Sequence, residues 1–222
     1  MNGAVLGPPG GGERFVIRDV VPVRAERIGP ILAGVSAQTV ATTCATLLLL
    51  GVPAGLAGLA VPAFRRRVAR FVMPATALVP VLAMAGSLYF SERAGFVPCE
   101  LCWYQRIAMY PLAVIMPIAA FRRDRSVLPY VSVVAAIGLA ISAYHVYIQA
   151  FPEESNFCEI TNPCSATWVE AYGWLTIPWM AGLSFVVFLL GVATMWRLER
   201  DAEIGGQRTE AEAVTQQPED AR

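Results

Sequence analysis

Two pairs of closely spaced cysteines are the residues of this sequence best suited to chemistry. Cys99 and Cys102 enclose Glu100 and Leu101 in a Cys-X-X-Cys motif that precedes an apolar stretch. The motif is therefore expected where a loop enters a helix, and the free N–H groups of a helix start lower a thiol pKa. Arg106 follows Cys102 by four residues, on the same helix face, where its charge favours a thiolate and can hold an anionic or carbonyl ligand. This pattern indicates a redox dithiol; a passive structural disulfide and half of a metal site are the other interpretations.

The second pair consists of Cys158 and Cys164, which are separated by five residues in a short acidic segment. A disulfide that closes so small a loop is accessible and exchanges readily with other thiols. Taken alone, such a pair is more often structural. The first pair favours the exchange interpretation, because disulfide exchange needs relay partners. All four cysteines are therefore candidate catalytic residues.

A single histidine and a fifth cysteine complete the reactive side chains. His145 lies near the end of an uncharged run at 126–152. It is either a packed or capping residue, or a group that hydrogen-bonds a carbonyl or manages a proton at a membrane interface. Cys44 stands among threonines and leucines, where a small buried hydrophobic residue is the expected role. No metal is expected, because two cysteine pairs on an oxidising surface form disulfides before they bind zinc.

The composition indicates an integral membrane protein. Of the 222 residues, 56% are hydrophobic and 15% are charged, and the mean hydropathy is +0.52. A typical soluble domain is about 25% charged. More than half of the charged residues lie within 1–30 and 197–222, which leaves the centre of the chain nearly uncharged. The net charge is zero, without a basic stripe to neutralise phosphates, so nucleic acid is excluded as a partner.

Membrane helices must position these residues. A helix needs about 20 apolar residues to cross the hydrocarbon core. Uncharged runs predict such helices near 71–91, 101–121, 127–149 and 176–196. Arginines cluster before the first helix, between the second and third, and after the fourth, which predicts that both ends of this unit face the cytoplasm. Both cysteine pairs then lie on the extracytoplasmic face. The expected fold is an all-α integral membrane protein, a four-helix transmembrane bundle with an extra N-terminal hydrophobic helix.

The chain outside the unit at 71–196 divides into three segments. Residues 1–30 are expected to form a polar tail, and residues 197–222 a disordered cytoplasmic tail, because the stretch at 201–222 is polar and lacks aromatic side chains. Residues 31–64 are apolar and form either one span or a hairpin broken at Gly51-Val52-Pro53; one extra helix is favoured. Cleavage of this segment as a signal peptide would place the arginines at 65–70 outside, so it is not expected.

A longer motif surrounds the first cysteine pair. The sequence there reads Phe96-Val97-Pro98-Cys99-Glu100-Leu101-Cys102-Trp103-Tyr104-Gln105-Arg106-Ile107-Ala108-Met109-Tyr110-Pro111, and the second pair lies within Asn156-Phe157-Cys158 and Asn162-Pro163-Cys164-Ser165. These stretches resemble the DsbB disulfide-bond formation proteins, and most closely the BdbC-type members of Gram-positive bacteria. The resemblance covers residues 71–196. The segment at 31–64 and the charged tail depart from the short termini of that family.

The resemblance implies a membrane thiol:quinone oxidoreductase, a multi-pass protein of the bacterial cytoplasmic (inner) membrane. A reduced DsbA-like partner of thioredoxin fold would attack Cys158, and Cys164 would be the resolving cysteine. The electrons would then pass by exchange to Cys99 and Cys102.

The same resemblance implies a quinone-binding site. Cys102 would engage the quinone as a thiolate in charge-transfer contact with the ring, and Arg106 and His145 would assist binding. The quinone would be menaquinone or ubiquinone from the membrane pool, and the BdbC-like signature favours menaquinone.

Three other functions compete with this interpretation. A vitamin K epoxide reductase-like enzyme also uses two cysteine pairs, but its Cys-X-X-Cys typically follows the loop pair, whereas here it comes first. A thiol reductase fed from the cytoplasm needs cysteines facing the cytoplasm or the middle of the membrane, and only Cys44 qualifies. A non-enzymatic membrane protein with structural outer disulfides predicts bridges that resist mild reductant.

Overall fold

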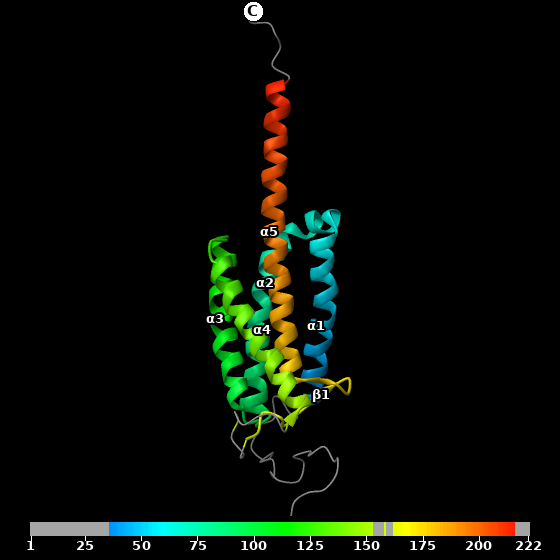
Figure 1. The fold of residues 1–222 in the computed structure, drawn as a ribbon, viewed down its shortest axis with the longest axis vertical. Coiled ribbons are helices and arrows are strands. Elements are labelled where there is room, and N and C mark those ends of the chain that lie inside the picture. Colours follow the sequence, from blue (N-terminus) through cyan, green and yellow to red (C-terminus); the bar gives the residue numbers. More distant parts are fainter. Residues whose placement is uncertain (1–35, 153–157, 159–161, 216–222) are drawn as a thin grey trace, which may run out of the picture.

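The computed structural model describes residues 36–152, 158 and 162–215. Within these ranges the chain forms five long helices, one short π-helical turn and a small hairpin (Figure 1). The elements are α1 (Ala37–Ala60), α2 (Pro62–Leu88), the π-helical η1 (Tyr89–Arg93), α3 (Glu100–Arg122), α4 (Leu128–Ala150), β1 (Glu170–Ala171), β2 (Leu175–Thr176) and α5 (Ile177–Thr215). The two strands pair antiparallel, Glu170 with Thr176 and Ala171 with Leu175.

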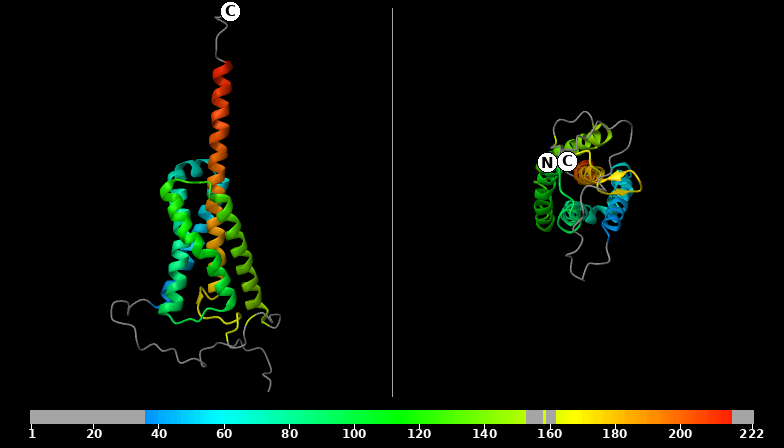
Figure 2. Two further views of the ribbon diagram at one scale, coloured as in Figure 1. Left: turned by 90° about the vertical axis from the view of Figure 1, so that its left-hand side faces the viewer. Right: turned by 90° about the horizontal axis from the view of Figure 1, so that it is seen from below.

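Four helices enclose the main hydrophobic core. Each of α2, α3, α4 and α5 packs on the next, and α5 returns to α2, while α1 lies outside this ring against α5 and α2 (Figure 2). Phe185 and Phe188 of α5 are fully buried at the centre. A Cβ added at Gly138 of α4 would stand 2.2 Å from the Phe185 ring. Only glycine therefore lets α4 lie this close to α5.

The outer surface of the bundle is that of a membrane protein. The helical segments α1, Pro62–Arg93, α4 and Ile177–Ala211 are long and apolar enough to cross a membrane. Helix α3 is 23 residues long, packs between α2 and α4, and exposes Ile107, Val114 and Ile118. Apolar side chains on the outside are stable in lipid. The prediction of an all-α integral membrane bundle with an extra N-terminal helix is confirmed.

The extra segment is a single helix and not a hairpin. Helix α1 continues through Pro53 to Ala60, and Val61 then adopts an extended conformation before Pro62 opens α2. Proline suits the first position of a helix because its missing N–H needs no partner there. Helix α2 thus begins nine residues before the predicted span at 71. The uncharged run locates the membrane core, whereas the helix itself includes the arginines that precede it.

The C-terminal expectation is wrong for the residues that the structure describes there. Residues 201–215 continue α5 as a helix instead of forming a disordered tail. Alanine, glutamate, glutamine and arginine in this stretch all favour helix. Asp201 also accepts from Arg65 at 2.6 Å, which ties the start of the stretch to α2. Residues 1–35, with the expected polar tail, and 216–222 lie outside the described residues.

The bundle has two distinct ends. Helix α1 starts, α3 starts and α4 ends at the end that carries Cys99, Cys102, Cys158 and Cys164, called here the cysteine end (Figure 1). At the opposite end, the buried Arg65 donates to the carbonyl oxygens of Gly58 and Leu59 and to Asp201. Helix α5 projects beyond that opposite end.

Candidate functional site

The first cysteine pair lies at the start of α3, as the sequence predicts. Cys99 is the N-cap residue, and its Sγ accepts from the backbone N–H of Cys102 at 3.4 Å. The two Sγ atoms lie 2.9 Å apart. Cys99 is 5% exposed, whereas Cys102 is half-buried. The helix start therefore holds both sulfurs together and leaves Cys102 as the more accessible one.

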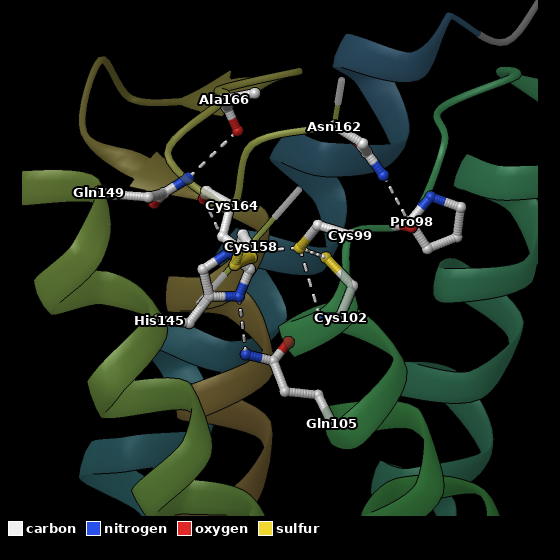
Figure 3. Close-up of a disulfide and its surroundings, with 10 residues drawn as sticks. All are labelled: Pro98, Cys99, Cys102, Gln105, His145, Gln149, Cys158, Asn162, Cys164 and Ala166. Carbon is white, nitrogen blue, oxygen red and sulfur yellow. Dashed lines mark hydrogen bonds between the residues drawn. A yellow bond between two sulfur atoms is a disulfide. The ribbon is translucent and has the colours of Figure 1, made fainter. Parts of the chain in front are cut away.

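The second pair forms a disulfide that packs directly on the first pair. Cys164 is 1% exposed and shares a buried cluster with Cys99, Leu101 and Ile148, against which Cys158 packs. Figure 3 shows the disulfide beside the Cys99 sulfur. The Asn162 amide donates to the carbonyl oxygen of Pro98 at 3.1 Å and so fastens the loop to the approach of α3. The structure thus brings all four predicted catalytic cysteines into one place.

His145 lies at the junction between the two pairs. Its Nε2 is 3.7 Å from Cys99 Sγ and 3.0 Å from the carbonyl oxygen of Cys164, and its Nδ1 is 3.2 Å from Nε2 of Gln105 (Figure 3). When the Gln105 amide donates to Nδ1, the imidazole proton sits on Nε2, facing Cys164 and Cys99. The side chain is 2% exposed. This buried imidazole therefore contacts both redox pairs.

The environment of the first pair favours a thiolate on Cys99. The Cys102 thiol donates toward Cys99 Sγ and holds the pKa of Cys99 well below its usual range. His145 lowers this pKa further, whereas burial opposes the shift. The resemblance assigned the thiolate to Cys102. That assignment concerns Cys102 in contact with a quinone, whereas the lowered pKa of Cys99 concerns the dithiol by itself.

A cavity of about 120 Å³ lies on the other side of Cys102, between α1, α2, α3 and α5. Cys102 and Arg106 line it, as their spacing on one helix face predicts. The remaining lining is mostly apolar and includes Phe96, Trp168 and Cys44. An apolar cavity of about 150 Å³ can hold a benzene ring. This cavity is therefore close to the size of one small ring and lies beside a thiol and a fixed positive charge.

Arg106 is oriented by α2 and by a neighbouring side chain of its own helix, α3. Its Nη2 donates to the carbonyl oxygen of Ser87 at 3.1 Å, and Tyr110 donates to Ser87 Oγ at 3.2 Å. The guanidinium also lies 5.2 Å from the centre of the Trp103 ring. These contacts hold the charge at the cavity wall. His145 is not among the residues that line this cavity, although its ring lies within 4.8 Å of the Cys102 sulfur.

Three side chains at the site could be mistaken for a metal centre. The ligand atoms of Cys99, Cys102 and His145 lie within 4.8 Å of one another. Both ring nitrogens of His145 already contact protein groups, Gln105 on one side and Cys164 with Cys99 on the other. The same arrangement also suits disulfide exchange between the two adjacent pairs.

Sequence reasoning missed two contributors to the site. Gln105 has no distinctive chemistry of its own, and its role appears only through its contact with His145. Cys44 was assigned to general packing, yet it lines the cavity together with Cys102. The spacing between them is long in sequence, so no local pattern could have joined the two.

Comparisons with known proteins agree with this geometry. Residues 69–197 match the family described as "Disulfide bond formation protein DsbB". The chain is 45% identical over 115 residues to disulfide bond formation protein C of Bacillus subtilis (strain 168), covering 51% of this chain and 83% of that protein. It is 43% identical over 112 residues to a probable disulfide formation protein of Oceanobacillus iheyensis, covering 49% and 77% respectively. No solved structure gives a significant match.

Proposed function

Because the chain belongs to the DsbB family, and is therefore a membrane oxidoreductase of disulfide bond formation, we propose that it passes electrons from a thiol partner to a membrane quinone. The thiol partner is an extracytoplasmic, DsbA-like protein of thioredoxin fold. The contact between the two cysteine pairs, with a cavity on the far side of Cys102, is the observation that carries this proposal.

The first step is disulfide exchange at the loop pair. A thiolate of the partner attacks Cys158 Sγ, the S–S bond to Cys164 breaks, and Cys164 leaves as a thiolate. Cys158 is half-exposed and Cys164 is buried, so a partner can reach Cys158 first. The second cysteine thiolate of the partner then attacks the sulfur of the partner's first cysteine, which is bonded to Cys158 in the mixed disulfide. This attack releases the partner with its own disulfide formed and leaves Cys158 and Cys164 reduced. Two electrons have then entered the protein.

The second step moves these two electrons to the Cys99–Cys102 pair in its oxidised form. Cys164 is packed beside Cys99, so its thiolate needs no large movement to attack that disulfide. His145 contacts both partners of this exchange and can hold the proton that leaves or joins a sulfur. The exchange ends with Cys158 and Cys164 joined again and with Cys99 and Cys102 as thiols.

The residues beside Cys102 fit a quinone. A quinone that accepts two electrons and two protons would complete the cycle by returning Cys99 and Cys102 to a disulfide. The cavity is mostly apolar, which suits a ring, and Arg106 supplies a donor for a carbonyl oxygen. Menaquinone and ubiquinone both carry such carbonyl groups.

The arginine distribution supports the proposed orientation in a bacterial cytoplasmic membrane. Arg65, Arg66 and Arg67, together with Arg122 and Arg123, gather at the end of the bundle opposite the cysteines. Basic residues favour the cytoplasmic side. The cysteine end then faces outward, where disulfides form and persist.

The test is quinone reduction by purified protein in detergent, with a reduced thioredoxin-fold dithiol as donor. Menaquinone and ubiquinone analogues are compared, and Cys102→Ser and Cys158→Ser variants are measured in parallel. Turnover that is lost in both variants supports the relay through both pairs. Absence of turnover with either quinone, with both bridges intact, would contradict the proposal and favour structural disulfides.

A further inference from the structure

One wall of the cavity comes from outside the part of the chain that matches the DsbB family. The family match begins at residue 69, whereas α1 ends at Ala60. Cys44 and Leu48 of α1 nevertheless line the cavity that holds Cys102 and Arg106. The family helices α2 and α5 contribute the neighbouring lining, including Gly86 and Ala181. Helix α1 therefore closes the side of the cavity that lies between α2 and α5.

This wall is packed closely against the bundle. A Cβ added at Gly55 would stand 2.8 Å from Leu190 Cβ of α5, and one added at Gly58 would stand 3.0 Å from Thr194 Oγ1. Small residues let two helices approach this closely. At the cysteine end, the Gln38 amide donates to the carbonyl oxygen of Glu170 at 2.7 Å. The helix that carries Cys44 and Leu48 is thus held in place next to the cavity.

We propose that α1 is a specificity-determining wall of the quinone cavity, in which Cys44 and Leu48 limit the width of the ring that can lie beside Cys102 and Arg106. The proposal rests on the proposed function, because it concerns the quinone of that same site. Cys44 and Leu48 border the same cavity as Cys102 and Arg106, so a side chain enlarged at this wall takes up space that a ring needs. A fused two-ring naphthoquinone should be affected more than a one-ring benzoquinone.

A matched pair of variants on α1 tests the wall. Leu48→Trp enlarges a lining residue, whereas Leu47→Trp places the same side chain at the neighbouring position, which does not line the cavity and is 54% exposed. The KM of each variant is measured for a naphthoquinone and a benzoquinone. We expect Leu48→Trp to raise the naphthoquinone KM at least tenfold and the benzoquinone KM less. Leu47→Trp should match the wild type, and single-turnover oxidation of the thiol partner should be unchanged in both.

A second measurement does not depend on any substitution. When both catalytic pairs are oxidised, Cys44 is the one remaining thiol of the chain. Its labelling by a small methanethiosulfonate is followed with and without a saturating, fully substituted benzoquinone. We expect quinone to slow this labelling at least fivefold.

The outcomes separate the two proposals. If the wild-type protein reduces no quinone, the proposed function fails. If it reduces quinone, but Cys44 labelling is unaffected by quinone and the two tryptophan variants have equal KM values, the wall proposal is overturned and the function stands. If Leu48→Trp does not fold, the labelling experiment decides alone.

Discussion

The carbonyl oxygen of Cys164 lies 3.0 Å from Nε2 of His145, so a buried histidine of α4 holds the backbone of the loop cysteine that faces the first pair. The loop and α4 are thereby joined at the backbone of the cysteine through which electrons are proposed to pass. The disulfide loop is positioned by this contact at one cysteine and by the Asn162 amide on the Pro98 carbonyl near α3. Each of these attachments can be changed separately.

His145→Phe should slow electron passage between the pairs and lower stability. The substitution leaves the Cys164 carbonyl and the Gln105 amide without their buried partner, which costs about 1–3 kcal/mol of unfolding free energy. His145→Gln keeps a hydrogen-bonding group and should recover part of the stability and part of the rate of electron passage. Thermal denaturation measures the stability, and alkylation after rapid mixing with reduced partner measures the transfer. If His145→Phe passed electrons between the pairs at the wild-type rate, the histidine would have only a packing role.

Arg106→Ala should raise the apparent quinone KM by about 10- to 100-fold. A hydrogen bond to a charged group contributes about 1.5–3 kcal/mol, and 1.4 kcal/mol corresponds to a factor of ten. Arg106→Lys keeps the charge but not the planar donor group, so an intermediate value is expected. Oxidation of the partner in a single turnover, without quinone, serves as the control and should not change. An unaltered quinone dependence in Arg106→Ala would remove this arginine from the site.

The reduced protein should carry a thiolate on Cys99 at pH values where an ordinary thiol is protonated. Because the pKa of Cys99 is lowered, the thiolate is present above the lowered value and is lost only when the pH falls through it. Absorbance at about 240 nm, followed from about pH 9 down to pH 5, reports the thiolate against a reference thiol pKa of about 8.5. Cys99→Ser should abolish the low-pH absorbance, and Cys102→Ala should shift its loss to higher pH because the donor is gone. Cys44→Ala is the control and should retain it.

Asp201→Ala should destabilise the protein far more than Glu199→Ala. Asp201 pairs with Arg65, whose side chain is buried, whereas Glu199 pairs with the exposed Arg125. Removing the partner of a buried charge costs several kcal/mol, and here about 1–3 kcal/mol is expected because Arg65 keeps two backbone carbonyls. The exposed pair should be worth less than about 1 kcal/mol. Denaturation of the two variants in the same detergent makes the comparison, and equal losses would contradict the difference in burial.

Much of the site could be predicted because its chemistry is local in sequence. Cys99 and Cys102 lie next to the start of an apolar run, which places them at a helix start, and four residues separate Cys102 from Arg106 on one face. The positions of His145 and Cys44 in the site do not follow from local sequence. Each is defined by a helix–helix contact, α4 against the loop and α1 against the cavity. Such contacts depend on packing between distant segments and leave no periodic signal.

The ends of the helices could likewise be predicted only in part from the sequence. The uncharged runs used as predicted spans lie almost wholly within helices, but the helical conformation extends past them, from Pro62 at the start of α2 to Thr215 at the end of α5. Charged residues end the apolar core of a span without ending the helix, because arginine and glutamate favour helix outside the membrane. The lowered pKa of Cys99 likewise depends on a contact across the fold, because His145 of α4 lies 3.7 Å from the Cys99 sulfur and lowers that pKa.

Helix α1 is attached to the four-helix unit at several points along its length. Glycines in its second half lie against α5, Gln38 anchors its start, and Arg65 joins the carbonyl oxygens at its end to Asp201. A helix fastened in this way belongs to the same cooperative unit as the four helices beside it. The segment at 69–197 therefore owes part of its stability to a helix that precedes it. Heating should melt α1 together with the four helices beside it, and cutting the chain before residue 69 should lower the temperature at which those four helices unfold.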